Sequence, residues 1–550
     1  MKNHIVQKMV FMIIIYTLLL QGDNATPRLT LIFVIDQLAY NTLQLVQSHL
    51  HKGLKRLLAE GVVFTNAHHP HGMPATCTGH TALSTGAYGN EHGIVGNSWI
   101  NTEGKHVACD DASAVDAAVL SPDGEYAYGK SFQYGMVDGI SDQFVLQSTK
   151  EEPYYAYGIS LKSRAAIATA NRAGIALWFD AQSGTFTSSK AYVQTLPEWV
   201  IAFNKQYAVT SPGQIRWQQK YNNNAAYSMV LYDNYKYVAS HKPLVNTIIP
   251  IGPMVDAKNP YELFMLTPAA NQLMIDCATA CVQAHINKEK PDTLLLWACI
   301  SSLDKLGHAY GPWSKETVDM LYHLDYQISA MMHTIESYID PASIVYVLTS
   351  DHGISPIVQQ MNQKGFNFAK RIDSEQLIKN LNKYVQETYG YTNSIYGIKG
   401  HQLYLNTNIL MKMPYQERQK LIKDLQVLLE SHDGIKRAWT PEELLMRCFP
   451  RYSAENYFKQ QLFKNRSGNL IMQVYPYTII TSHPYGTSHK TPYTYNTHVP
   501  LIVYQKGTIQ KKQIHTKVLT LQLAPTLAQL LHIPQPSCAM EEVLPGILPE

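Results

Sequence analysis

Three apolar stretches, far apart along the chain, each end in a cluster of acidic or imidazole side chains. LTLIFVIDQ leads to Asp36, DTLLLWACISSLDKLGH to Asp304 and His308, and SIVYVLTSDHG to Asp351 and His352. Continuous apolar runs of this length are typical of strands buried on both faces of a parallel sheet. Because the carboxyl ends of parallel strands meet at one edge, the pattern predicts an α/β fold with these polar residues gathered there.

Helical patterns occupy the intervals between the predicted strands. Residues 314–339 predict a long helix with Ser314 as its N-cap and one apolar face, made of Val318, Leu321, Leu324, Ile328, Met331 and Ile335. Residues 498–507 predict a further strand, and residues 519–531 predict a helix with Pro525 in its first turn. The chain therefore alternates strands and helices almost to its C-terminus.

Two regions do not follow this alternation. Residues 184–263 are rich in Tyr, Asn and Gln, and residues 359–472 are more helical and mixed. We expect both to be insertions that cap the edge of the sheet. The 550-residue chain would then hold one large catalytic domain, residues 26–550, rather than several small domains.

The N-terminus has the order of a signal peptide. Lys2 and Lys8 precede an apolar run from Met9 to Leu20, and small and polar residues follow. This run is shorter than the ~20 apolar residues that a spanning helix needs, so we expect no stable membrane span after cleavage. Residues 1–25 therefore predict export to the periplasm or the medium.

The composition is that of a folded globular protein. Hydrophobic residues make up 45% and charged residues 16%, and the net charge of +3 arises from dispersed Lys and Arg. Without a basic patch, nucleic acid is not expected as the main partner.

The seven cysteines are an odd number, so at least one thiol is unpaired, and the pairing cannot be deduced from sequence. Cys277 and Cys281 share a helical face, where two packed thiols are favoured over a disulfide.

Each acidic or imidazole cluster has an ordinary explanation when taken alone. An Asp after a strand is usually a cap or turn residue. When the clusters are taken together, however, they offer the nitrogen and oxygen ligands that suit Zn²⁺. Three protein ligands per ion would leave one coordination position open for substrate. Two ions are the natural count for this set.

Five motifs occur in the order and spacing of a known family: LIFVIDQ, PATCTGHTALSTGAYGNEHGIVGN, SLDKLGH, TSDHG and GTSHKTPYTYNTHVPLIVY. The chain resembles the alkaline phosphatase superfamily and is most similar to the PafA-type phosphate monoesterases, over essentially its whole length after residue 25. The resemblance implies a three-layer sandwich, with a mostly parallel sheet and helices on both faces. It also implies two Zn²⁺ sites, one formed by Asp36, Asp351 and His352 and the other by Asp304, His308 and His489.

The resemblance further implies that Thr76 is the nucleophile. Thr76, Cys77 and Thr78 are adjacent, and Cys77 is intrinsically the best nucleophile of the three at neutral pH. Coordination to a metal would reverse this order by holding the Thr76 hydroxyl as an alkoxide, which would form a phosphothreonine. Cys77 lacks the Pro and Arg that follow the modified Cys or Ser of sulfatases, so we expect it to be a small packing residue beside Thr76.

Lys162 and Arg164 bear on the class of substrate. On an extended segment, residues i and i+2 point the same way, so both cations could meet a phosphoryl group with two negative charges. The resemblance implies that this pair and Asn97 contact the non-bridging oxygens in monoesterases, whereas diesterases lack the pair. The ordinary alternative is that Lys162 and Arg164 lie on an exposed strand and form surface ion pairs instead of binding substrate.

We therefore expect an exported, zinc-dependent alkaline phosphatase acting on small phosphate esters. The alternatives are a phosphodiesterase or nucleotide pyrophosphatase on the same fold, and a catalytically silent metal-binding relative. Oligomeric state cannot be derived from the sequence, and a monomer is compatible with it.

The other histidines are expected outside the site: His68, His69 and His71 in a solvated loop, and His80, His92 and His498 as structural or ligand-orienting residues.

Overall fold

A computed structural model describes residues 26–209, 214–230, 243–250 and 261–547. The predicted signal peptide, residues 1–25, lies outside the described residues, as do parts of the predicted insertion 184–263. Among the described residues, no helix combines the length and the apolar character that a membrane span requires.

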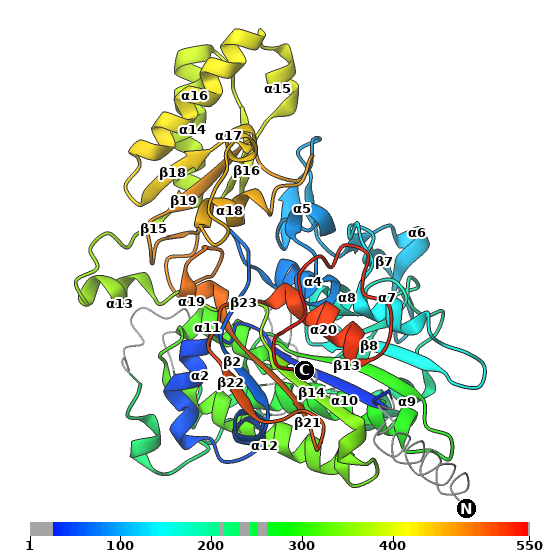
Figure 1. Cartoon of the computed structure of the whole chain (residues 1–550). Coiled ribbons are helices and arrows are strands. Elements are labelled where there is room, and N and C mark those ends of the chain that lie inside the picture. The colour runs from blue at the N-terminus through cyan, green and yellow to red at the C-terminus, as the bar shows by residue number, and fades with distance from the viewer. Residues whose placement is uncertain (1–25, 210–213, 231–242, 251–260, 548–550) are drawn as a thin grey trace, which may run out of the picture.

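A ten-stranded sheet forms the centre of the protein (Figure 1). Most of its strands are parallel, and β10 and β21 run antiparallel to their neighbours. In spatial order the strands are β10 (Thr185–Thr187), β9 (Ile175–Asp180), β8 (Tyr154–Ser160), β13 (Thr293–Ile300), β1 (Leu29–Ile35), β14 (Ile344–Thr349), β21 (His498–Gln505), β2 (Val62–His68) and β22 (Lys512–Ile514), with β23 (Val518–Leu519) also paired to β2. The α/β prediction is confirmed.

The three strands predicted from apolar runs are the three central neighbours of this sheet. β1 lies between β13 and β14, and Leu29 is in parallel register with Leu294 on one side and Ile344 on the other. Every residue of the three strands is buried. Their carboxyl ends therefore meet, which brings together the polar clusters that follow them.

Helices cover both faces of the sheet, as a three-layer sandwich requires. The first face packs against α2 (Tyr40–Val46), α3 (Gly53–Glu60), α9 (Glu198–Tyr207), α10 (Pro268–Ile286) and α12 (Lys315–Glu336). The second face packs against α4 (Thr76–Thr85), α7 (Ile140–Val145), α8 (Ser163–Ala170) and α20 (Leu523–Leu530).

Details of the predicted helices agree with the structure. The Ser314 hydroxyl caps α12 by accepting a hydrogen bond from the Thr317 N–H, and all six predicted apolar residues of this helix are buried. Pro525 lies in the first turn of α20. Cys277 and Cys281 are buried free thiols of α10, which confirms that packing was the better interpretation.

A second, smaller sheet lies above the main one (Figure 1). Its antiparallel strands are β16 (Ile395–Lys399), β17 (Gln402–Leu405), β19 (Leu470–Val474) and β18 (Ile435–Trp439). The helices α14 (Ser374–Tyr389) and α16 (Tyr415–Ser431) share a separate hydrophobic core with it. This unit overlaps the region 359–472 that we predict to be an insertion and ends two residues beyond it, at Val474. Its β16–β17 turn brings Lys399 toward Lys490 of the main body.

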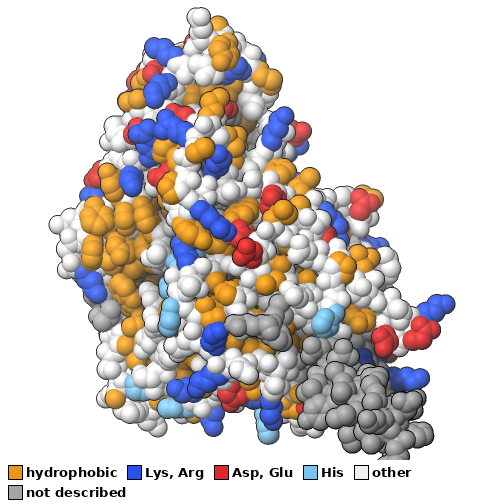
Figure 2. Space-filling view, in the orientation of Figure 1, with side chains coloured by type: hydrophobic (Ala, Val, Ile, Leu, Met, Phe, Trp, Pro, Cys, Tyr) orange, Lys and Arg blue, Asp and Glu red, His pale blue; other side chains and the backbone are white. Residues whose placement is uncertain are grey.

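Shorter elements complete the described chain. The helices are α5 (Gly89–His92), α6 (Ala114–Ala117), α11 (Ser302–Tyr310), α13 (Val358–Gln363), α15 (Thr407–Lys412), α17 (Pro441–Met446), α18 (Ala454–Lys459) and α19 (Thr494–Thr497). The strands form two-stranded sheets of β3 (Ser98–Ile100) with β4 (His106–Ala108), β11 (Gln214–Arg216) with β12 (Ile248–Pro250) and β15 (Arg371–Ile372) with β20 (Ile479–Ile480), and a three-stranded sheet of β5 (Asp111–Ala112), β7 (Gly124–Lys130) and β6 (Ala118–Ser121). Figure 2 shows Lys and Arg side chains scattered among acidic and apolar ones, without a continuous basic patch on this face.

Candidate active site

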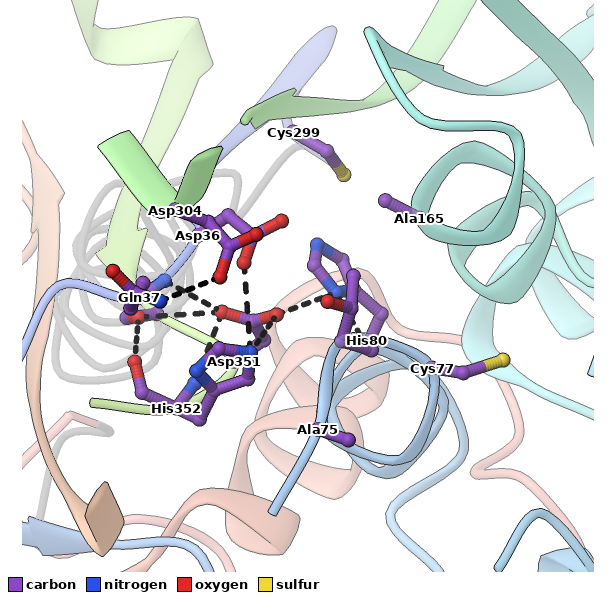
Figure 3. Close-up of polar contacts among 12 residues, drawn as sticks. Asp36, Gln37, Ala75, Cys77, His80, Ala165, Cys299, Asp304, Asp351 and His352 are labelled. Atoms are coloured by element: carbon purple, nitrogen blue, oxygen red, sulfur yellow. Dashed lines mark hydrogen bonds and ion pairs between the residues drawn. The ribbon is translucent and has the colours of Figure 1, made fainter. Parts of the chain in front are cut away.

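The predicted polar residues converge at the carboxyl ends of the central strands. Asp36 directly follows β1, Asp351 and His352 follow β14, and α11, which carries Asp304 and His308, follows β13. His489 comes from the loop before α19, and its ring stacks on His352 with 3.8 Å between the ring centroids. Figure 3 shows Asp36, Asp304, Asp351 and His352 facing one another.

Each of the three histidines is held by the same kind of contact. The Nδ1 atoms of His308, His352 and His489 lie 2.8–2.9 Å from the backbone carbonyls of Thr487, Gly353 and Pro74 respectively. A carbonyl only accepts hydrogen bonds, so each Nδ1 carries the proton and each Nε2 is left with its lone pair. Metal-binding histidines are commonly oriented in this way.

Three buried carboxylates lie in the same space. Burial, reinforced by the charges of Asp304 and Asp351, raises the pKa of Asp36 well above its usual value. Burial also acts against ionisation of Asp304, but Lys162 and His308 overcome it and lower that pKa. The Lys162 Nζ lies 2.6 Å from Asp36 Oδ2 and also contacts Asp304 Oδ2. One ammonium cannot neutralise three carboxylates, so the site needs further positive charge.

The donor atoms fit bound metal. Asp36 Oδ1 and His352 Nε2 are buried and have no hydrogen-bond partner among the described residues, and Asp351 Oδ2 has only ion-pair contacts with imidazoles. Such orphaned polar atoms are costly unless a ligand or ion satisfies them. Two groups of three donors have their ligand atoms within 4.8 Å of one another: Asp304, His308 and His489 form one group, and Asp36, Asp304 and His352 form the other.

The second group differs in one member from the predicted set. Asp304 takes the place that the resemblance gives to Asp351, while Asp351 Oδ2 lies 3.3 Å from His352 Nε2. In this arrangement the Lys162 ammonium contacts the carboxylates of both Asp36 and Asp304. All six predicted metal ligands nevertheless belong to one continuous cluster.

Thr76 is the first residue of α4 and is buried beside this cluster. α4 packs directly on the Asp351 backbone, since a side chain at Gly79 would meet the Asp351 carbonyl oxygen at 2.2 Å. One turn after Thr76, His80 Nδ1 lies 3.2 Å from Asp351 Oδ2 (Figure 3). His80 thus contacts a predicted metal ligand.

The three residues predicted to bind phosphate lie around the N-terminus of α4 and the start of α8. Asn97 Oδ1 accepts a hydrogen bond from the Cys77 N–H at 2.8 Å, which places its amide next to Thr76. Lys162 reaches the carboxylates, as described above. Arg164 is partly buried and contributes to the pKa shifts of Asp110 and Lys490, so its charge also lies near the site.

The local structure predicted for Lys162 and Arg164 was wrong. They do not share an extended segment, because Lys162 is the N-cap of α8 and Arg164 lies in its first turn. The sequence after Arg164 is AAIATA, whose alanines favour a helix. The two cations therefore leave the backbone at a strand-to-helix junction.

Gln37 was missed by the sequence analysis. Its backbone has φ of 74°, and its N–H donates to Asp351 Oδ1 at 3.0 Å, while its side-chain amide donates to Asp304 Oδ1 at 2.7 Å. One residue therefore orients two carboxylates that arrive from different strands. Its only sequence signal is its position directly after Asp36.

The interpretation of Cys77 as a packing residue was wrong. Cys77 forms a disulfide with Cys109, and both are buried. The Cys109 loop runs beside Asn97, whose carbonyl accepts a hydrogen bond from the Cys109 N–H, so the second sulfur lies within reach of α4. Figure 3 shows the Cys77 sulfur on the far side of α4 from the carboxylates.

The expectation of a solvated loop at His68, His69 and His71 was also wrong, because all three are buried. His68 ends β2 opposite His498 and stacks on it, and His69 is held by the Ser350 carbonyl and the Thr520 hydroxyl. Burial lowers the pKa of His69 to about 4. The segment is buried because β2 pairs with β21 and β23 and because Ser350 and Thr520 contact His69. A local pattern of three histidines does not reveal these long-range contacts.

The structural interpretation of His498 and His92 agrees with their contacts. His498 Nε2 contacts the Thr65 carbonyl, and its ring stacks on Tyr40 as well as His68. His92 Nδ1 accepts a hydrogen bond from the Ile94 N–H. Neither residue contacts the carboxylate cluster.

Comparison with known proteins identifies relatives along nearly the whole chain. Alkaline phosphatase PafA from Elizabethkingia meningoseptica is 26% identical and covers 96% of both chains. Alkaline phosphatase PhoV from Synechococcus elongatus is 25% identical and covers 95% of this chain and 93% of its own. The crystal structure of wild-type alkaline phosphatase PafA has the same fold, with a TM-score of 0.82, 23% identity, and coverage of 96% of this chain and 99% of its own.

A family model also matches most of the chain. The model of type I phosphodiesterase / nucleotide pyrophosphatase matches residues 30–500, a range that contains all the predicted metal ligands together with Thr76, Asn97, Lys162 and Arg164. The chain has the mixed α/β fold of the PafA-like alkaline phosphatase superfamily. The protein belongs to the type I phosphodiesterase / nucleotide pyrophosphatase family and is a phosphoric ester hydrolase.

Proposed function

We propose that the protein is a zinc-dependent phosphate monoesterase, an alkaline phosphatase that uses Thr76 as its nucleophile. The observation that carries this proposal is the Lys162 ammonium, which lies inside the carboxylate cluster with a side chain only 12% exposed. A monoester brings a phosphoryl group with two negative charges, and a buried cation stabilises that group more than the single charge of a diester.

Two Zn²⁺ ions held by Asp36, Asp351, His352, Asp304, His308 and His489 would supply the charge that activates the Thr76 hydroxyl and stabilises the leaving oxygen. Thr76 attacks phosphorus, the bond to the leaving alkoxide breaks, and a phosphothreonine forms. Water then cleaves that ester, releasing phosphate and restoring the hydroxyl. His80 and Gln37 hold Asp351 and Asp304 in place during both steps.

Asn97, Lys162 and Arg164 would bind the non-bridging oxygens. Because Asn97 Oδ1 is occupied by the Cys77 N–H, its amide nitrogen is the atom left to donate toward a ligand. Lys162 contacts the same carboxylates that would bind the metals, so metal loading would release its ammonium toward the phosphoryl group. Arg164 adds a planar donor pair suited to two oxygens at once.

We infer that the substrates are small phosphate esters and that the enzyme acts outside the cytoplasm. The signal-like residues 1–25 support export, and so does the Cys77–Cys109 disulfide, since such bonds persist mainly in oxidising compartments. The similar proteins PafA and PhoV are both named alkaline phosphatases, which favours the same chemistry for this protein.

A phosphodiesterase or nucleotide pyrophosphatase is the second candidate. It is favoured by the description of the family whose model matches residues 30–500. A silent metal-binding protein is the third candidate, but such a protein would have no need of the buried threonine at the start of α4, beside the ligand cluster.

Steady-state turnover of p-nitrophenyl phosphate and bis(p-nitrophenyl) phosphate by the zinc-loaded protein separates these candidates. We expect faster turnover of the monoester and a loss of about 10²-fold or more in Lys162→Ala, as for removal of a donor to a charged transition state. Lys436→Ala is the control, because Lys436 is exposed on β18, away from the site. Faster turnover of the diester, or monoester turnover unaffected by Lys162→Ala, would contradict the proposal, and no turnover of either ester would support the silent relative.

A further inference from the structure

A small pocket beside the N-terminus of α4 contains two lysines that the proposed mechanism does not use. Lys399 and Lys490 line it together with Ala75, Asn97 and Gly400. Ala75 precedes the nucleophile and Asn97 is one of the residues proposed to bind the phosphoryl group, so the pocket adjoins the site of reaction.

The two lysines come from different parts of the chain. Lys399 is the last residue of β16 and pairs with Gln402 across the turn at Gly400 and His401, so the smaller sheet delivers it. Lys490 follows the proposed ligand His489. The β16–β17 turn lies against Lys490, because a side chain added at Gly400 would come within 4.0 Å of Lys490 Cδ, and both lysines line the same pocket.

The backbone at Lys490 has an uncommon conformation. Its φ is 87°, in the left-handed region that residues with a side chain seldom adopt. Such conformations cost of order 1 kcal/mol and persist mainly where the surroundings enforce them, often at functional sites. Here the conformation allows His489 to contact Pro74 while the next side chain enters the pocket.

The charges of this pocket are unbalanced. Among the described residues, neither Lys399 nor Lys490 forms an ion pair with an acidic side chain, in contrast to Lys130, which pairs with Asp110 and Asp111. Like charges held together in a partly buried pocket are unfavourable unless an anion joins them.

We propose that Lys399 and Lys490 bind a second oxyanion, carried on the alcohol part of the substrate. This inference rests on the proposed monoesterase function and narrows its substrate class to phosphate monoesters whose alcohol bears another phosphate or a carboxylate. Lys162 and Arg164 hold the phosphoryl group that is transferred, and Asn97 lies between the two anion sites. The smaller sheet thereby contributes to specificity through the β16–β17 turn.

Binding of three non-hydrolysable phosphonates to the zinc-loaded protein tests this inference by calorimetry. Propylphosphonate has one anionic group, propane-1,3-diyl bisphosphonate has two, and 4-phosphonobutanoate replaces the second by a carboxylate. We expect the doubly anionic ligands to bind at least tenfold more tightly than propylphosphonate, and the tighter of them identifies the preferred oxyanion. Lys399→Met and Lys490→Met should each reduce that ratio severalfold, whereas the control Lys436→Met should not change it.

Two outcomes would overturn the inference: equal affinity of the wild type for all three ligands, or an equal loss for all three in Lys490→Met. The second outcome would mean that the lysine binds the transferred phosphoryl group. Turnover of p-nitrophenyl phosphate by the same samples reports the proposed function separately. A preference for two anions without turnover would support the two-lysine site and contradict the monoesterase.

Discussion

His80 Nδ1 lies 3.2 Å from Asp351 Oδ2 and 2.8 Å from the carbonyl oxygen of Thr76, in the preceding turn of the same helix. The His80 imidazole thus links α4, the helix that begins with the proposed nucleophile Thr76, to the proposed metal ligand Asp351. Both partners are fully buried. The position of Thr76 and the orientation of Asp351 therefore depend on each other.

Replacing His80 should weaken metal binding without removing a ligand. We expect His80→Ala to lower zinc affinity by about 10–100-fold, the usual effect of losing a group that orients a ligand. His80→Asn should recover part of the loss, because the Asn amide can donate from near the Nδ1 position. Zinc competition with a chelator measures both variants, and wild-type affinity in His80→Ala would contradict this role.

Loss of the Cys77–Cys109 disulfide should destabilise the protein and disturb the site. The bond closes a loop with a sequence separation of 32, which corresponds to roughly 3–4 kcal/mol in the chain-entropy model. Asp110, next to Cys109, accepts a hydrogen bond from the Ser163 hydroxyl, so the same loop contacts the residue between Lys162 and Arg164. We therefore expect lower kcat/KM as well as lower stability in Cys109→Ser.

Denaturant unfolding and turnover measure these two effects. The control is Cys448→Ser, since Cys448 is exposed and forms no disulfide. Alkylation in denaturant should label Cys77 only after reduction. Equal stability of Cys109→Ser and the control, or labelling of Cys77 without reductant, would argue against the disulfide.

Acid should destabilise the fold partly through His92. Burial lowers the pKa of His92 to about 3, and the unfolded value is about 6.5, so the folded state favours the neutral ring. The resulting stability is present above pH 6.5 and is lost as the pH falls toward 3, by about 1.4 kcal/mol per pH unit for one proton. Protonation also removes the acceptor of the Ile94 N–H.

The variant His92→Asn keeps an acceptor for the Ile94 N–H but does not titrate. We expect its unfolding free energy to fall less steeply between pH 6 and pH 4 than that of the wild type. The two slopes should differ by about 1.4 kcal/mol per pH unit, the value for uptake of one proton. An unchanged slope would show that His92 does not contribute to the acid sensitivity.

The sequence predicted the parts of the fold that depend on local pattern. The apolar runs before Asp36, Asp304 and Asp351 correctly predict three neighbouring strands, because continuous apolar runs are typical of parallel strands that are buried on both faces. The cap at Ser314 is equally local. These features follow from backbone and side-chain preferences over a few residues.

Long-range contacts could not be predicted in the same way. The partner of Cys77 depends on the course of the loop at Cys109, and the burial of His69 depends on contacts with Ser350 and Thr520. The double role of Gln37 required the positions of Asp351 and Asp304 to be known. The location of Lys399 likewise follows from the arrangement of the smaller sheet.

The central claim is that Thr76 becomes covalently phosphorylated. Zinc-loaded protein is mixed with p-nitrophenyl phosphate, quenched in acid within the first turnover, digested and analysed by peptide mass spectrometry, with Thr76→Ala and Thr78→Ala beside the wild type. We predict one phosphate on Thr76 in the wild type and in Thr78→Ala, and none, with turnover lost, in Thr76→Ala. Phosphate on another residue, or undiminished turnover by Thr76→Ala, would contradict the account.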